Sequence, residues 1–212
     1  MTLRFFKSGF HKLWPPAMMT RGLLLLMLLL SSPLLAADFD KGVRAYKGND
    51  YATALAELRP LAEQGHIAAQ NMLGVMYDRG DGVQPNYVEG ARWYRLAAEQ
   101  GLAEAQYNLG LMYHGGDGVL QNYTEAVHWY RMAAERGFAK AQYNLGLMYY
   151  IGKGVPQDYT LAHMWGNLAQ AQGADRANEL VRILEIGMSS DQIATTQSMA
   201  RRCRAQDYKN CS

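Results

Sequence analysis

The chain has 212 residues, with 21 lysines and arginines against 19 aspartates and glutamates. A near-neutral chain without a basic stripe gives no indication of nucleic-acid binding, so nucleic acid is excluded as an expected partner. The length suits one elongated domain behind a short N-terminal segment.

That N-terminal segment, residues 1–37, has the composition of a leader. It carries four basic residues and no acid, then a leucine-rich run, then small residues at Ala36 and Ala37. These features are typical of a secretory signal peptide, so we expect a periplasmic or secreted protein. An uncleaved membrane anchor is the alternative. The apolar run over 22–35 contains Ser-Ser-Pro and is shorter than the roughly 20 residues of a spanning helix, so no membrane span is expected after cleavage.

Nine residues recur along the rest of the chain. Ala-Gln-Tyr-Asn-Leu-Gly-Leu-Met-Tyr stands at 105–113 and again at 141–149, with a looser copy at 69–77, so that successive copies are 36 residues apart. A fixed period in this range is typical of a solenoid. The sequence therefore predicts an all-α solenoid, with three full copies over 66–173.

One copy has the pattern of two helices joined by a glycine-rich turn. Residues 103–113 and 123–136 combine good helix formers with apolar residues at three- or four-residue spacing. Gly115 to Gly118 contains the glycines that accept the left-handed conformation at a helix end. We therefore expect antiparallel helix pairs.

Small residues and tryptophans predict how the helices pack. A glycine inside a helix costs about 1 kcal/mol relative to alanine, so the internal glycines imply close approach of the partner helix. The internal glycines are Gly74, Gly110 and Gly146, and the expected contact positions are Gly90, Ala126 and Ala162. We expect Trp93, Trp129 and Trp165 to fill the wedge between successive pairs, so that Trp129→Ala would cost about 3–5 kcal/mol.

Both ends depart from the repeat, as capping units do. Residues 38–65 are expected to form an N-terminal capping half-repeat, with Pro60 kinking its second helix. Residues 174–212 are expected to form C-terminal capping helices and a disulfide tail. Ser189 with Gln192 predicts a capping box that opens a final helix over 191–204.

The only cysteines are Cys203 and Cys211. In an exported protein two cysteines most simply form a disulfide, which here would pin the tail to the last helix. A redox or metal role is the alternative, and no histidine or third thiol accompanies the pair. The closed loop is short, so its stabilisation should be modest.

The repeated pattern resembles that of a known family. Ala-x-x-x-Leu-Gly-x-x-Tyr, then Gly-x-Gly-Val, then Tyr-x-x-Ala-x-x-Trp-Tyr-x-x-Ala-Ala-x-x-Gly is similar to the Sel-one-like repeat (SLR), a relative of the tetratricopeptide repeat. The resemblance implies a right-handed α-solenoid that acts as an adaptor in protein complexes, often in bacterial envelope and signalling systems. A cysteine-rich branch is described as binding or hydrolysing penicillin-type compounds. It carries a cysteine pair in each repeat, whereas this chain has none there.

The resemblance also implies a binding surface, because first helices line the concave face of tetratricopeptide-like pairs. Rigid aromatic residues on such a face suit the binding of another protein, whose identity the sequence does not give. The alternative is that the tyrosines pack between helices, and Asn108 and Asn144 are expected to bond from helix to helix. The expected partner-binding positions are Asn71, Val75, Asp78, Tyr107, Leu111, His114, Tyr143, Leu147 and Tyr150.

The sequence predicts no catalytic residue, cofactor or metal site. The histidines form no His-x-x-x-His pair, and 78–82 is expected to be a turn because it matches a calcium loop only loosely. Gly-x-Ser-x-Gly, Ser-x-x-Lys and phosphate-loop motifs are absent. We therefore expect a scaffold for protein–protein interaction and no enzyme. The alternatives are a periplasmic regulator of a membrane sensor and an enzyme acting on cell-wall amides or β-lactams.

Overall fold

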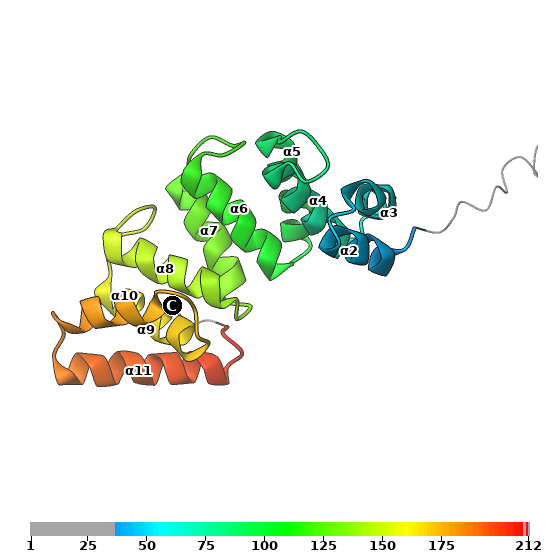
Figure 1. Cartoon of the computed structure of the whole chain (residues 1–212). Coiled ribbons are helices and arrows are strands. Elements are labelled where there is room, and N and C mark those ends of the chain that lie inside the picture. The colour runs from blue at the N-terminus through cyan, green and yellow to red at the C-terminus, as the bar shows by residue number, and fades with distance from the viewer. Residues whose placement is uncertain (1–36, 210, 212) are drawn as a thin grey trace, which may run out of the picture. The chain divides into compact units, whose positions relative to one another are not determined.

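This computed structural model describes residues 37–209 and 211, which contain ten helices and no strand. The predicted signal peptide lies outside the described residues except for Ala37. None of the described helices is long and apolar enough to cross a membrane. The helices are α2 (Phe39–Lys47), α3 (Tyr51–Glu63), α4 (Ile67–Arg79), α5 (Tyr87–Glu99), α6 (Ala103–Gly115), α7 (Tyr123–Ala134), α8 (Ala139–Ile151), α9 (Tyr159–Ala171), α10 (Ala177–Glu185) and α11 (Ser190–Ala205) (Figure 1).

The helices pack in sequential pairs within the unit formed by residues 38–212. The pairs α4–α5, α6–α7 and α8–α9 are the three full copies, and the second helix of each copy also packs against the helix that follows it (Figure 1). At the C-terminal end α9 contacts both α10 and α11. The predicted all-α fold of helix pairs is therefore confirmed.

The glycine-rich turns join neighbouring copies as well as the two helices of one copy. Each first helix ends at a left-handed glycine, as α6 does at Gly116. Two residues on, Gly118 has a φ of +67°, and a Cβ there would lie 2.2 Å from the carbonyl carbon of Tyr87 in the preceding copy. No larger residue fits that backbone contact. Gly154 meets Tyr123 in the same way. The turn predicted at 78–82 begins only at Gly80, because Asp78 and Arg79 are the last residues of α4.

The internal glycines of the first helices lie against their partner helices, as predicted. A Cβ on Gly110 would lie 3.4 Å from the carbonyl oxygen of Ala126, and one on Gly146 would lie 3.0 Å from that of Ala162. Gly110 also has a second neighbour that was not predicted from the sequence. Its Cβ would lie 2.6 Å from the ring of Tyr130. In the third copy Gly166 replaces this tyrosine. The repeated aromatic contact therefore stops before α10.

The wedge role predicted for the tryptophans holds only in part for Trp129. Trp165 is fully buried and Trp93 is 5% exposed, but Trp129 is only partly buried. The adjacent Tyr130 occupies the interior instead and is itself fully buried. Trp129 packs on the edge of the apolar cluster that α5 and α6 share, so it lies between successive pairs without being enclosed there.

A buried glutamine near the start of each first helix bonds to the preceding helix, and in two of the three copies also to the end of its own second helix. The Nε2 atoms of Gln70, Gln106 and Gln142 donate to the carbonyl oxygens of Ala62, Ala98 and Ala134 in the preceding helices, over 3.0–3.2 Å. The Oε1 atoms of Gln70 and Gln142 accept from Gln100 and Gln172, which follow the second helices, at 2.7 Å each. Arg136 stands at the corresponding place in the middle copy, and Oε1 of Gln106 has no partner among the described residues.

The C-terminal cap agrees with its predictions. Ser189 and Gln192 form the capping box, and Cys203 and Cys211 are joined by the disulfide. The tail also reaches back to the repeats, because a Cβ on Gly137 would lie 2.9 Å from the ring of Tyr208. At the other end Pro60 lies inside α3, whose kink stays a prediction.

We predict that Trp165→Ala lowers the free energy of unfolding by about 3–5 kcal/mol, because it empties a fully buried site. Trp129→Ala is the matched control and should cost clearly less, because its indole is already partly solvated. Urea denaturation of both variants measures the difference. Equal losses would contradict the difference in burial between Trp165 and Trp129 as the cause.

We also predict that Arg136→Gln raises the free energy of unfolding by about 0.5–1.5 kcal/mol, because a glutamine can donate to the buried Oε1 of Gln106. The mirror variant Gln172→Arg removes the donor from Gln142 and should be destabilised by a similar amount. Urea denaturation measures both changes. A destabilised Arg136→Gln protein would show that the buried oxygen is satisfied in another way.

Candidate functional site

The nine predicted partner-binding positions lie on the first helices α4, α6 and α8. One of them is not available for binding. Asn71 is only 6% exposed, and its Oδ1 accepts a 3.4 Å hydrogen bond from Asn108 in the next copy. This correction has a simple cause, because the short amide lies between α4 and α6, where its copies are the longer tyrosines Tyr107 and Tyr143. The helix-to-helix role predicted for Asn108 is confirmed.

Tyr107 both packs between helices and reaches the surface. Its ring centroid lies 5.2 Å from that of Phe138 and 6.1 Å from that of Tyr130, and the side chain is half-buried. Burial raises the pKa of its hydroxyl, and a hydrogen bond with Asn144 opposes the rise. The packing alternative thus accounts for part of the ring and leaves one side open.

That open side belongs to a hollow of about 260 Å³. The structure brings Tyr107 and Tyr143 together there with residues from the start of α8 and from the connection between α9 and α10. The lining residues are Tyr107, Lys140, Tyr143, Asn144, Ala174, Asp175 and Arg176. The hollow combines two aromatic rings with two cations and one carboxylate. It therefore offers flat apolar contact and hydrogen-bond donors to the same ligand.

Sequence reasoning missed the charged part of this hollow. Lys140 holds the copy position of Glu104, so the repeat itself carries no sign of a shared charge there. Arg176 lies just past the last full copy and adopts a left-handed backbone with φ +61° ahead of α10. Only the packing of α10 against α9 places it beside Tyr143.

The other predicted positions lie outside that hollow. Asp78 is half-buried, and burial raises its pKa, although Arg79 opposes the rise. The ring of His114 meets Tyr123 edge-on at 5.4 Å, and burial lowers the pKa of His114, with Lys153 adding to the shift. Leu111, which also lies on α6, is 39% exposed. The remaining positions, Val75, Leu147 and Tyr150, are all partly buried.

The C-terminal junction carries a polar cluster that the sequence analysis also missed. Arginine-to-tyrosine bonds connect each second helix to the next first helix. They join Arg59 to Tyr77, Arg95 to Tyr113 and Arg131 to Tyr149. Asn167 and Glu185 occupy the next pair of repeat positions. The sequence does carry a signal for this cluster. The arginine and tyrosine that recur in each earlier copy are absent at 167 and 185, and this break marks the place where the repeat ends.

In place of the missing arginine-to-tyrosine bond, His163 forms a buried hydrogen-bond network. Its side chain is 0% exposed, Nδ1 lies 2.6 Å from Oγ1 of Thr196, and Nε2 lies 3.4 Å from Oε1 of Glu185. Nδ2 of Asn167 donates to the backbone oxygen of His163 at 2.8 Å. Burial lowers the pKa of His163, and Glu185 opposes the shift. The network fixes α9, α10 and α11 to one another.

Metal chemistry finds no support in the part of the chain that the structure describes. No group of three or more His, Cys, Asp or Glu side chains there is placed to hold a metal ion.

Comparison with known proteins identifies the repeat. The Sel1 repeat family pattern matches residues 67–102, 103–138 and 139–173, which together make up half of the chain. These limits agree with the three copies predicted over 66–173. No curated protein matches the chain significantly.

Two solved structures are similar over most of the repeat region. A Sel1 repeat protein from Oxalobacter formigenes is 40% identical, with a TM-score of 0.65, over 68% of this chain and 59% of its own. A protective antigen present in uropathogenic Escherichia coli strains, which displays an SLR fold, is 26% identical, with a TM-score of 0.56, over 80% of this chain and 46% of its own. This chain thus spans about half the length of these two proteins.

We predict that His163 makes the protein less stable in acid. A histidine of ordinary pKa near 6.5 in the unfolded chain binds a proton more readily than the buried His163 does. The free energy of unfolding therefore falls as the pH drops through about 6.5. Urea denaturation at pH 7.5 and pH 5.5 should show a smaller difference for His163→Gln than for the parent. An unchanged difference would show that other groups cause the acid sensitivity.

Proposed function

The chain belongs to the Sel1 repeat family of helical repeat scaffolds, and from this we propose that it is an exported scaffold that binds another protein through its first helices. We define the first-helix face as the exposed parts of α4, α6 and α8. The proposed mechanism is docking of a peptide or domain on this face, without chemistry on the partner.

One observation carries the proposal, namely the hollow that contains Tyr107 and Tyr143. Tyrosine supplies a large rigid contact surface with a polar tip, and such residues are enriched at the centres of binding interfaces. Lys140 and Arg176 add charged hydrogen-bond donors at the rim. A partner that offers carbonyl or carboxylate oxygens next to an apolar group would satisfy both parts.

Export is supported by the two ends of the chain. The leader-like segment 1–37 precedes the helical unit, and the Cys203–Cys211 disulfide closes its C-terminal end. Disulfides persist in oxidising compartments such as the periplasm and the extracellular space. We therefore place the scaffold in the periplasm or outside the cell.

Photo-crosslinking in the native cells tests the first-helix face. Tyr143 is replaced by p-benzoylphenylalanine in the full chain, and Val88 near the start of α5 is replaced in the same way as the control. Val88 is 64% exposed but lies on a second helix. We expect a discrete protein adduct from position 143 and none from position 88. Adducts of equal yield from positions 143 and 88, or none from position 143, would refute the proposal.

A second experiment separates binding from folding. We predict that Tyr143→Ala loses the adduct formed from a crosslinker at Lys140, while its free energy of unfolding changes by no more than about 1–2 kcal/mol. Tyr107 is less suitable, because its ring also packs on Phe138 and Tyr130. Circular dichroism and urea denaturation measure the folding change. A full adduct yield from Tyr143→Ala would exclude the tyrosine from the interface.

A further inference from the structure

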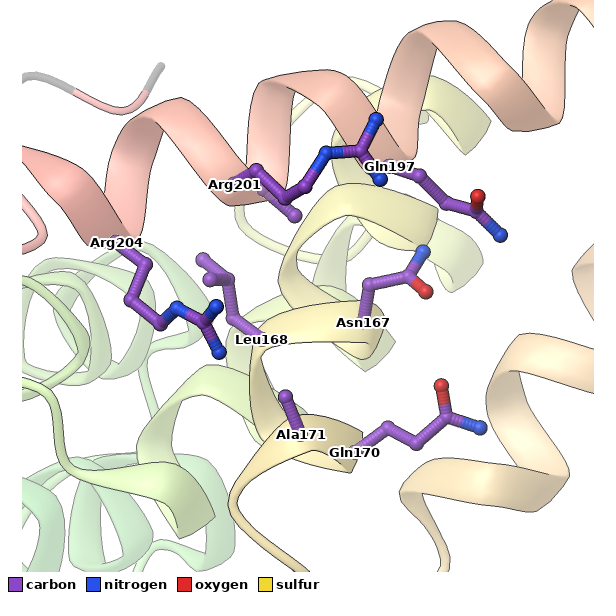
Figure 2. Close-up of a pocket in the computed structure, with 8 residues that line it drawn as sticks. Asn167, Leu168, Gln170, Ala171, Gln197, Arg201 and Arg204 are labelled. Atoms are coloured by element: carbon purple, nitrogen blue, oxygen red, sulfur yellow. The ribbon is translucent and has the colours of Figure 1, made fainter.

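A second hollow, of about 240 Å³, lies between α9 and α11, away from the first-helix face (Figure 2). Its polar lining consists of two guanidinium groups and three side-chain amides, from Asn167, Gln170, Gln197, Arg201 and Arg204. Three apolar side chains, Leu168, Ala171 and Ala200, complete the lining. None of the lining residues is acidic.

The arrangement follows from helical spacing on two packed helices. Gln197, Arg201 and Arg204 are four and three residues apart, so they lie on one face of α11. Asn167 and Gln170 come from the last turns of α9. Figure 2 shows Arg204 extending from α11 beside Leu168 of α9, with Gln197 lying opposite Asn167.

Part of the wall of this hollow is held in place by contacts within the cap. Asn167 is fixed by its bond to the His163 carbonyl oxygen, and Thr196 of α11 contacts the His163 ring. Cys203, which is buried and disulfide-bonded, lies between the two lining arginines in sequence. These contacts hold the backbone of α9 and α11 and the Asn167 amide, which lowers the entropy lost when a ligand binds.

The charges of the two lining arginines are not neutralised by an ion pair within the described part of the chain. The ion pairs among the described residues are Lys41–Glu57, Arg92–Glu89 and His163–Glu185, so neither Arg201 nor Arg204 is paired with a described carboxylate. Guanidinium groups bind carboxylates through paired N–H donors, and the neighbouring amides can donate to the same oxygens. The hollow therefore has the chemistry of a carboxylate receptor.

We propose that this hollow binds carboxylate side chains of an acidic peptide segment on a partner protein. Its volume is below the roughly 300–1,000 Å³ of pockets that enclose a small molecule. One or two glutamate or aspartate side chains fit that space, and the apolar wall accepts their methylene groups. The C-terminal cap thus has a docking site of its own, separate from the Tyr107–Tyr143 hollow.

Fluorescence anisotropy with a labelled hexaglutamate peptide and the full chain tests the proposal. We expect Arg201→Gln and Arg204→Gln each to weaken binding about tenfold, because each removes charge-assisted hydrogen bonds. Arg202→Gln is the matched control, since Arg202 is exposed on the same helix but does not line the hollow. It should change the dissociation constant less than twofold. Arg201→Lys keeps the charge without the paired donors and should give an intermediate value.

Other outcomes would overturn the proposal. Equal weakening by Arg202→Gln would indicate attraction to the net charge of the helix rather than a site. Hexaglutamine binding as tightly as hexaglutamate would exclude carboxylate recognition, and free glutarate binding as tightly as the peptide would exclude a peptide ligand. The photo-adduct formed from position 143 does not depend on Arg201 and should persist in Arg201→Gln, so failure of the cap site and failure of the first-helix face are distinguishable.

Discussion

The structure depends on a buried glutamine that each copy places near the start of its first helix. A buried amide atom without a partner is costly, so a donor and an acceptor in neighbouring helices stabilise such a glutamine. Gln70 and Gln142 have both, because they bond the preceding helix on one side and the residue after their own second helix on the other, whereas Gln106 makes only the bond to the preceding helix. The complete set of bonds positions three helices at once. It also explains why the motif repeats with so little change.

The cap forms where the repeated contacts are replaced. Gly166 stands where Tyr94 and Tyr130 occur in earlier copies, and Asn167 and Glu185 stand in place of an arginine and a tyrosine. The space left by the missing ring admits Leu180 of α10, which lies 3.4 Å from a Cβ built on Gly146. Buried His163 then joins α9 to α10 and α11. α9 therefore packs against three helices, α8, α10 and α11, whereas a second helix within the repeats, such as α5, packs against two. The hollow between α9 and α11 results from this additional contact.

The two proposed docking sites use the fold in different ways. The hollow at Tyr107 and Tyr143 arises from equivalent positions of neighbouring copies, so repetition itself builds a continuous surface for a partner. The hollow at Arg201 and Arg204 arises from the end of the repeat, where a helix outside the period supplies the charge. A scaffold with both sites could hold an extended partner at two separate points, and each site would add to the affinity of the other by raising its effective concentration.

The sequence alone determined the features that depend on period and local chemistry. These are the helix pairs, the turn glycines, the small-residue contacts of Gly110 and Gly146, the capping box at Ser189 and the disulfide. The tertiary structure decided which member of a repeated set is buried, because neighbours from other helices set that outcome. Trp129 is partly exposed where Trp165 is enclosed, and Asn71 is buried where its tyrosine copies reach the surface. It also decided both hollows, since Arg176 and Arg201 lie outside the period and meet their neighbours only through the packing of α10 and α11 on α9.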